Sequence, residues 1–137
     1  MAYKQALKLL GSERTFSSQL EKAGKRMFGH QFGGVFARDT LPAVMQQGRR
    51  GYIVNTDTIQ GSGVHWIAAM DIDGERMMSD PLGKIGRAQR KELDTLQQPI
   101  WSEDDPEMKA SASTCGPRSL AALAVGLKLG KDAFLAL

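Results

Sequence analysis

Cysteine and histidine are scarce in this chain of 137 residues, which has one cysteine, Cys115, and two histidines, His30 and His65. A single cysteine cannot form an intramolecular disulfide, and it excludes a cysteine-rich zinc site. Two histidines without a metal-ligand spacing such as His-Glu-x-x-His do not indicate a metal centre either. We therefore expect no metal site.

Long apolar runs are also missing. No run approaches the ~20 residues that a membrane-spanning helix needs. The first ten residues include two lysines but no apolar core of a secretory signal. We therefore expect a protein that is not secreted, that works in the reducing interior of a cell and that has no membrane partner. The length is that of a single domain spanning residues 1–137.

Charge is moderate and unevenly spread. The net charge is +3, from 18 basic and 15 acidic residues, and four of the acids lie in the segment 103–107. Outside that segment 18 basic residues face 11 acidic ones, a net charge of +7. Such a bias is compatible with a nucleic-acid surface and equally with ordinary solubility.

Helical patterns stand near both ends of the chain. Partial periodicity predicts a helix that ends at Gly29, and the glycine-interrupted stretch 32–42 is expected to be an ordered loop. Residues 86–97 predict a charged surface helix. The last helix is predicted to begin near Cys115 and to stop at Gly130. It is apolar over most of its circumference, which is typical of a helix central to a fold.

Strand patterns fill the middle of the chain. Residues rich in β-branched and aromatic side chains predict strands at 51–56, 64–70 and 75–79. Residues 71–74 are expected to be the turn of a hairpin, and a short last strand is predicted around 100–101. The sequence thus predicts an α+β protein, in which a central helix bearing the cysteine packs on a small, mostly antiparallel sheet.

Cys115 is expected at a polar helix start, a position that favours a reactive cysteine. Amide dipoles at a helix N-terminus favour a thiolate, and free amides there can bind an oxyanion. The following Gly116 would let a substrate backbone approach closely. A buried structural cysteine is the alternative, and the sequence leaves both interpretations open at this point.

His65 and Asp80 stand at the ends of two neighbouring predicted strands. If residues 64–70 and 75–79 form a hairpin, its open end brings the two side chains together. A carboxylate at that place would hold the imidazole tautomer and stabilise the imidazolium, as in nucleophile–base–acid triads. The alternatives are a structural histidine and an aspartate that serves only as a turn residue before proline.

Five short segments then follow one another in a distinctive order. They are Phe32-Gly33-Gly34-Val35-Phe36 with Asp39 and Leu41-Pro42, Tyr52-Ile53-Val54-Asn55-Thr56, Gly63-Val64-His65-Trp66, Ser79-Asp80-Pro81-Leu82-Gly83, and Cys115-Gly116. Together, with the predicted hairpin between two of them, they resemble the adenovirus maturation protease (adenain) family of viral cysteine proteases. That family is related in fold to the SUMO-deconjugating proteases.

The resemblance implies a papain-like or adenain-like fold and one type of enzymatic reaction. The activity is that of a cysteine endopeptidase that cleaves viral precursor proteins of the capsid or core during particle maturation, in the virion and the host cell interior. The implied catalytic residues are Cys115 as nucleophile, His65 as base and Asp80 as the acidic member, a glutamate in adenain itself. The implied substrate-binding residues are Asp39, Asn55, Gly63 and Trp66.

The chain departs from the family pattern in three ways. The family usually has a glutamine shortly before the cysteine, as an oxyanion donor. Here residues 105–109 contain none, and the nearest are Gln97 and Gln98. The chain also stops soon after the cysteine helix, so a homo-oligomer or a partner covering that helix is expected. A disulfide-tethered peptide cofactor is excluded, because there is no second cysteine.

DNA is an activator in that family and is the one activator the resemblance suggests here. Arg49-Arg50 could contact phosphates, as could Arg87, Arg90 and Lys91, which fall on one face of the predicted helix. A solvated charged face is the alternative. No other cofactor is expected from the sequence.

Two rival functions stay open beside the endopeptidase. One is an isopeptidase that removes a ubiquitin-like modifier with the same three residues. The other is a virion or nucleic-acid-binding module that keeps the fold and has lost catalysis. The missing glutamine favours this last alternative, whereas the joint presence of cysteine, histidine and aspartate argues against it.

Overall fold

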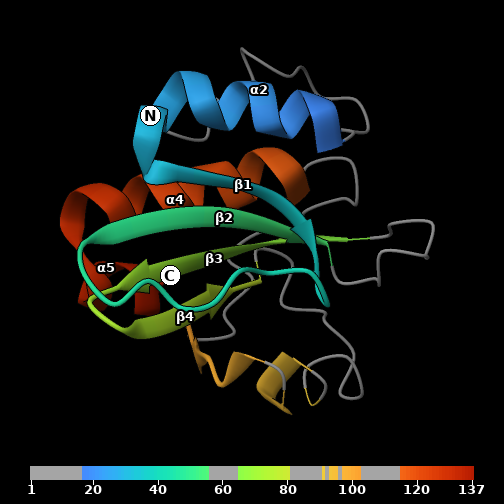
Figure 1. Ribbon diagram of the computed structural model, residues 1–137. Coiled ribbons are helices and arrows are strands. Elements are labelled where there is room, and N and C mark those ends of the chain that lie inside the picture. Colours follow the sequence, from blue (N-terminus) through green and yellow to red (C-terminus); the bar gives the residue numbers. More distant parts are fainter. Residues whose placement is uncertain (1–16, 56–64, 81–90, 92, 96, 103–114) are drawn as a thin grey trace.

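The structure is a computed structural model, in which the described residues are 17–55, 65–80, 91, 93–95, 97–102 and 115–137 (Figure 1). Their elements follow in the order α2 (Ser17–Phe28), the short 3-10 helix η1 (Gly29–Gln31), β1 (Phe32–Ala37), β2 (Arg49–Asn55), β3 (Trp66–Ile72), β4 (Glu75–Ser79), β5 (Ile100–Trp101), α4 (Cys115–Leu129) and α5 (Lys131–Leu135). The α+β class predicted from the sequence is confirmed.

The five strands form one sheet in the order β1-β2-β3-β4-β5. β2, β3 and β4 pair antiparallel, but β1 pairs parallel to β2 and β5 pairs parallel to β4. The sheet is therefore mixed: its three central strands pair antiparallel, as the sequence predicted for most of the sheet, and the two outer strands are parallel to their neighbours. The segment between β1 and β2 runs back along the sheet before β2 begins, so the two strands point the same way (Figure 1).

β1 corrects an expectation, because the first part of the stretch 32–42 predicted as a loop, Phe32–Ala37, is a strand. The two glycines that seemed to interrupt it are accommodated by a register shift between Phe32 and Gly34, where Gly34 has a φ of 125°. A Cβ on Gly33 would lie 2.3 Å from the ring of Tyr52. These glycines therefore allow a bulge and a close approach to β2 rather than ending the strand.

The hairpin between β3 and β4 is tighter than the predicted four-residue turn. The strands pair up to Ile72 and Glu75, and only Asp73 and Gly74 connect them, with φ values of 45° and 89°. Two residues with positive φ match the right-handed twist of the paired strands. The other predicted elements are confirmed where they are described, including β4, β5, the helix start at Cys115 and the helical state of the described residues between 91 and 97.

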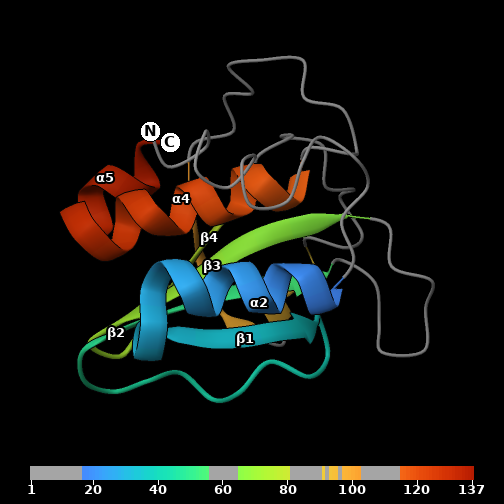
Figure 2. The same cartoon turned by 90° about the horizontal axis from the view of Figure 1, so that it is seen from above.

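One face of the sheet carries α2, α4 and α5. α2 and α4 contact each other, and both pack on the sheet together with α5 (Figure 2). The buried side chains between these layers include Leu20 of α2, Ile53 and Met70 of the sheet, Leu123 of α4 and Phe134 of α5. The burial of α4 is thus provided by this chain itself. A homo-oligomer or partner over the helix stays a prediction.

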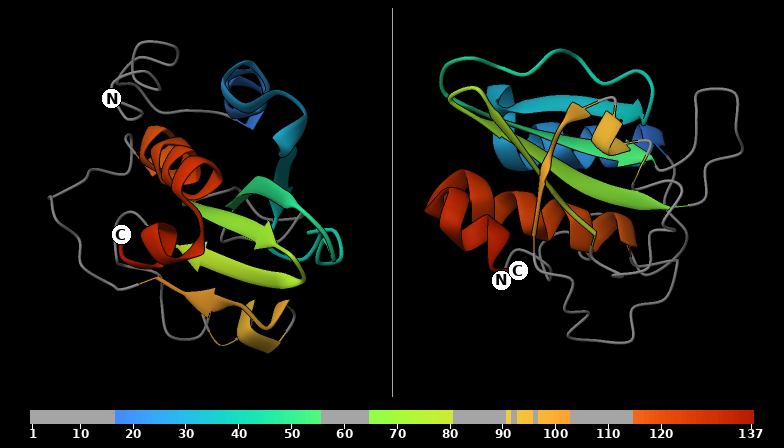
Figure 3. Two further views of the ribbon diagram at one scale, coloured as in Figure 1. Left: turned by 90° about the vertical axis from the view of Figure 1, so that its left-hand side faces the viewer. Right: turned by 90° about the horizontal axis from the view of Figure 1, so that it is seen from below.

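The opposite face has a second core of its own. It joins Tyr52, Val54, Ile67 and Met78 of the sheet to Leu93 of the helical residues near 91–97. Figure 3 shows these helical residues and β5 on the β4 side of the sheet, away from α2.

A buried ion pair lies on this second face. Arg76 donates from Nε to Asp71 Oδ1 at 2.8 Å and from Nη2 to Asp71 Oδ2 at 2.9 Å, and both side chains are fully buried. The same arginine donates to the side chain of Gln97 and lies 5.4 Å from the ring centre of Tyr52. Asp71 also accepts from the backbone of Met45 at 3.1 Å. The pair therefore connects the hairpin to both segments that cover it.

α4 lies close to the sheet because glycines occupy two of the contacts between them. A Cβ on Gly126 would lie 2.4 Å from Met70 Sδ and 2.7 Å from the ring of Phe134. A Cβ on Gly51 would lie 2.9 Å from Leu123. Both neighbours of Gly126 are fully buried, so they have little room to move.

We expect Gly126→Ala to destabilise the protein by about 1–3 kcal/mol through overpacking, although alanine has the higher helix propensity. Urea denaturation would measure the change, with Lys128→Ala on the exposed side of the same helix as the control, expected within about 0.5 kcal/mol of wild type. A variant as stable as the control would show that α4 does not depend on this close approach.

Removal of one ion-pair partner should be more damaging than removal of both. We expect Arg76→Met to cost about 3–5 kcal/mol, because it leaves Asp71 buried without its countercharge. The double variant Asp71→Leu with Arg76→Met should regain most of that loss. Urea denaturation of both variants tests this, and additive losses in the double variant would contradict it.

Candidate active site

Four strand ends meet at one edge of the sheet. β1 and β2 both end there, at Ala37 and Asn55, which are paired with each other. Asn55 is in turn paired with Trp66, the first residue of β3, and β4 ends beside it at Ser79 (Figure 1). Side chains at or just beyond these ends therefore gather at the same edge.

His65 and Asp80 are in contact at this edge. The last pair in the β3–β4 ladder is Ala68 with Ser79, so the continued register puts Asp80 opposite Ile67, diagonal to His65. Diagonal neighbours on paired strands are within reach of long side chains. The distance from His65 Nε2 to Asp80 Oδ1 is 2.6 Å, with the aspartate side chain fully buried and the histidine side chain 14% exposed. The expectation that the hairpin's open end brings them together is confirmed.

Cys115 joins this pair from the helix side. It is the first residue of α4 and only 3% exposed. Ser119, one turn further on, donates from Oγ to the backbone carbonyl of Trp66 at 3.1 Å, so the N-terminus of α4 lies against the start of β3. A side-chain hydrogen bond links Cys115 to His65. The structure therefore brings together the three residues expected from the sequence.

The site holds His65 in its protonated form near neutral pH. Burial by itself lowers the pKa of His65, but the hydrogen bonds to Asp80 and Cys115 and the negative charges of both groups outweigh it and raise this pKa to about 9. Both ring nitrogens of an imidazolium are donors. Because Nε2 faces Asp80, Nδ1 is the nitrogen left for the sulfur. An imidazolium beside a cysteine favours the thiolate.

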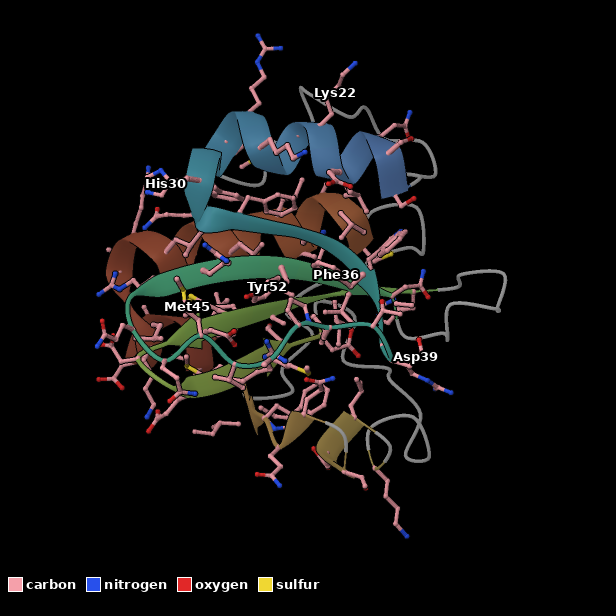
Figure 4. The ribbon with its side chains drawn as sticks, viewed as in Figure 1. Lys22, His30, Phe36, Asp39, Met45 and Tyr52 are labelled. Carbon is pink, nitrogen blue, oxygen red and sulfur yellow. The ribbon has the colours of Figure 1, made fainter. Side chains whose placement is uncertain are left out.

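Of the four expected substrate-binding residues, the structure places two near His65. Asn55 is buried and lies on the same face of β2 as Gly51 and Ile53, which face α4. Trp66 is partly buried and packs on the same core. Asp39 is exposed in the turn that follows β1 (Figure 4), and Gly63 lies outside the described residues. Asn55 and Trp66 are thus at the edge that carries His65.

The position of Asn55 relative to Cys115 follows from the geometry of the two elements. Gly51 of β2 faces Leu123 of α4. Four residues of strand from Gly51 to Asn55 span roughly 13 Å, and eight residues of helix from Leu123 back to Cys115 span about 12 Å. Since α4 begins at the edge where β2 ends, Asn55 and Cys115 stand at the same level of the molecule.

Neither glutamine considered as an oxyanion donor is directed to the cysteine. Gln97 accepts a hydrogen bond from Arg76 on the sheet face opposite α4. Gln98 is exposed and has a φ of 48°. The segment 103–114 lies outside the described residues. In the described part, the nearest main-chain donors are the amides at the start of α4, where the first N–H groups have no partner within the helix.

The basic residues considered for DNA have mixed surroundings. Arg49 donates from Nη1 to the carbonyl of Leu127 at 3.1 Å and so contacts the C-terminal end of α4, where a positive charge is favourable. Arg50 is partly buried and near Tyr52. Lys91 is exposed, and the other two helix positions lie outside the described residues. DNA activation stays a prediction.

Ser119 is a site-related residue that sequence reasoning missed. Its only signal was a serine in an otherwise apolar helix face, which periodicity alone cannot distinguish from a tolerated small residue.

The residues that the structure describes show neither a metal centre nor a membrane span. No group of three histidine, cysteine, aspartate or glutamate side chains there could hold a metal ion. No helix in that part of the chain has the length and apolar character needed to cross a bilayer.

Comparison with known proteins gave no relative: no family model matches the chain, and no curated protein matches its sequence. Any functional conclusion therefore has to come from the residues of the site.

The protonation of His65 is directly measurable. We expect its ring to titrate near pH 9 by NMR, and Asp80→Asn to lower that pKa because the variant removes the negative charge. The folded pKa lies above the unfolded value of about 6.5. The group therefore stabilises the fold fully below about pH 6.5, and this contribution, on the order of 3 kcal/mol, is lost as the pH rises through 9.

Urea denaturation on both sides of this pH window tests the linkage. Wild type and the control variant Asp132→Asn, changed at an exposed carboxylate of α5, should both lose stability between about pH 6.5 and 9. Asp80→Asn should lose much less. An equal pH dependence in all three proteins would show that the His65–Asp80 contact is not charged as described.

Proposed function

We propose that this chain is a cysteine endopeptidase, with Cys115 as nucleophile, His65 as general base and acid, and Asp80 as the residue that orients His65. The contact that carries the proposal is the 2.6 Å hydrogen bond between Asp80 and His65, beside the only cysteine of the chain. A buried carboxylate, an imidazole and a thiol in series have the arrangement of a nucleophile, its base and the group that orients the base.

The first half of the reaction forms a thioester. The thiolate of Cys115 attacks the carbonyl carbon of the scissile bond, and the carbonyl oxygen becomes an oxyanion. The intermediate collapses as the C–N bond breaks, and the His65 imidazolium gives its Nδ1 proton to the leaving amine. Asp80 stays ionised throughout and holds Nε2–H, so the ring cannot rotate away from the sulfur.

The second half releases the acid product. His65, now neutral, accepts a proton at Nδ1 from a water molecule, and the resulting hydroxide attacks the thioester carbonyl. The C–S bond breaks, the carboxylic acid leaves, and the thiolate–imidazolium pair is restored. The Asp80 carboxylate lowers the energy of the imidazolium that forms in this step.

The start of α4 supplies the charge stabilisation for the oxyanion. The amides of Cys115 and Gly116 are at the first turn of the helix, where the first N–H groups have no partner within the helix and the dipole is positive. One oxyanion donor typically contributes a factor of ~10²–10³ in rate. The lack of a positioned glutamine is therefore compatible with a slower enzyme rather than an inactive one.

The substrate class rests on the resemblance of the five segments to adenain. It is a precursor protein of the capsid or core of a virus particle, held as an extended peptide near Asn55 and Trp66. The location in the virion and host cell rests on the same resemblance. The isopeptidase and the inactive module are the outcomes that the experiment below has to separate from it.

The decisive variants are Cys115→Ala and His65→Ala. Both should fold, and both should reduce cleavage of glycine-containing peptides on the order of 10⁴-fold or more. In wild type, iodoacetamide should alkylate Cys115 at neutral pH, and His65→Ala should slow that alkylation. Mass spectrometry gives both readouts.

Two other results would lead to different conclusions. Labelling by a ubiquitin-like activity probe, without peptide cleavage, would favour the isopeptidase. If Cys115 reacts like a free or buried thiol and wild type cuts no peptide, even with DNA present, the protein is a binding module and the endopeptidase proposal is wrong.

A further inference from the structure

Ser119 is a fully buried serine on the side of α4 that faces β3. Its Oγ donates to the backbone carbonyl of Trp66 at 3.1 Å, across 53 positions of the chain. Buried serines within helices commonly bond to the carbonyl four residues earlier, which here would be that of Cys115. This one instead joins the helix to another element. The contact is therefore part of the tertiary structure and not of the helix alone.

The two ends of this hydrogen bond are next to the reacting groups. Ser119 is four residues after Cys115, so both lie on the same helix face, one turn apart. Trp66 directly follows His65 at the start of β3. A single hydrogen bond thus ties the turn that carries the thiol to the strand end that carries the imidazole.

Among the described residues, the other contacts of α4 with the sheet lie further along the helix and are mainly apolar, apart from the hydrogen bond from Arg49 to the carbonyl of Leu127 near the far end of α4. Leu123 packs over Gly51, and Gly126 packs against Met70. Apolar packing resists separation of the layers, but it has no preferred direction. A hydrogen bond has a defined length and direction, so Ser119 can set the height and rotation of the first turn of α4 relative to β3.

We propose that Ser119 is a positioning residue that holds Cys115 in register with His65. This inference rests on the proposed function, because the register matters for thiolate formation and acyl transfer. Misplacement of a reacting group by about 1 Å can cost ~10²-fold in rate. Alanine at this position would keep the helix and remove only the directional contact, while it leaves the carbonyl of Trp66 without this donor.

The test compares Ser119→Ala with Ser102→Ala. Ser102 is also a buried serine, at the end of β5, and its contact with Met78 is made by its backbone amide, which the substitution keeps. Both variants lose one hydroxyl from a buried site. Only Ser119→Ala loses a link between the thiol-bearing helix and the histidine strand.

We expect Ser119→Ala to fold, to lower kcat for peptide cleavage by roughly 10- to 100-fold, and to leave KM nearly unchanged. Alkylation of Cys115 by iodoacetamide at neutral pH should slow, and the His65 ring should titrate at lower pH than in wild type by NMR. Ser102→Ala should match wild type in all three readouts. Ser119→Thr, which keeps the hydroxyl, should restore the wild-type alkylation profile.

Several results would overturn the inference. One is a Ser119→Ala protein whose alkylation profile and His65 titration match those of Ser102→Ala. Another is a folded Ser119→Thr protein as impaired as Ser119→Ala. If the alanine variant does not fold, the comparison of Ser119→Thr with wild type tests the inference instead, and a folded threonine variant with impaired alkylation would overturn it. Failure of the proposed function would be distinguishable, because wild type itself would then cleave no peptide. The alkylation of Cys115 and the titration of His65 would still test whether Ser119 positions these two residues.

Discussion

The register of the β3–β4 hairpin is the constraint on which the candidate site depends. The connection by Asp73 and Gly74 alone fixes which residues are opposite along both strands, and that pairing puts the carboxylate after β4 diagonal to the imidazole before β3. A shift of one residue would turn alternate side chains to the other face of the sheet. It would remove His65 from Asp80 and, with it, the negative charge that keeps the imidazole protonated despite its burial.

The helix that carries the thiol depends on a second constraint, which is its close distance from the sheet. Glycines at two contacts, Gly51 of β2 under Leu123 and Gly126 of α4 against Met70, let α4 lie close to the sheet, and the Ser119 hydrogen bond joins its first turn to the start of β3. On the opposite face, the buried pair of Asp71 and Arg76 holds the covering segments to the same hairpin. The hairpin is thus fixed from both sides, as a site needs when its geometry must be accurate to a fraction of an ångström.

Much of this site could be predicted from local sequence, because each part has a short-range signal. The β-branched and aromatic runs predict the strands, and the apolar helix after Cys115 is evident from its composition. β1 was missed because Gly33 and Gly34 look like breaks, whereas their role depends on Tyr52 in the next strand. The parallel pairing of β1 and β5 was missed because periodicity carries no information on strand neighbours. Asp71 was assigned to a turn because nothing local showed that Arg76 would neutralise it.

The start of α4 also limits how an oxyanion could be bound. A helix offers its first N–H groups without internal partners, but proline has no N–H, and Pro117 is the third residue of α4. In the described part of the chain, the amides of Cys115 and Gly116 are therefore the donors that this turn can direct at an oxyanion. Gln97 does not add to them, since Arg76 holds its side chain on the other face of the sheet. The carbonyl of a bound peptide would therefore have to lie directly over the end of the helix, where the absence of a side chain on Gly116 leaves room for it.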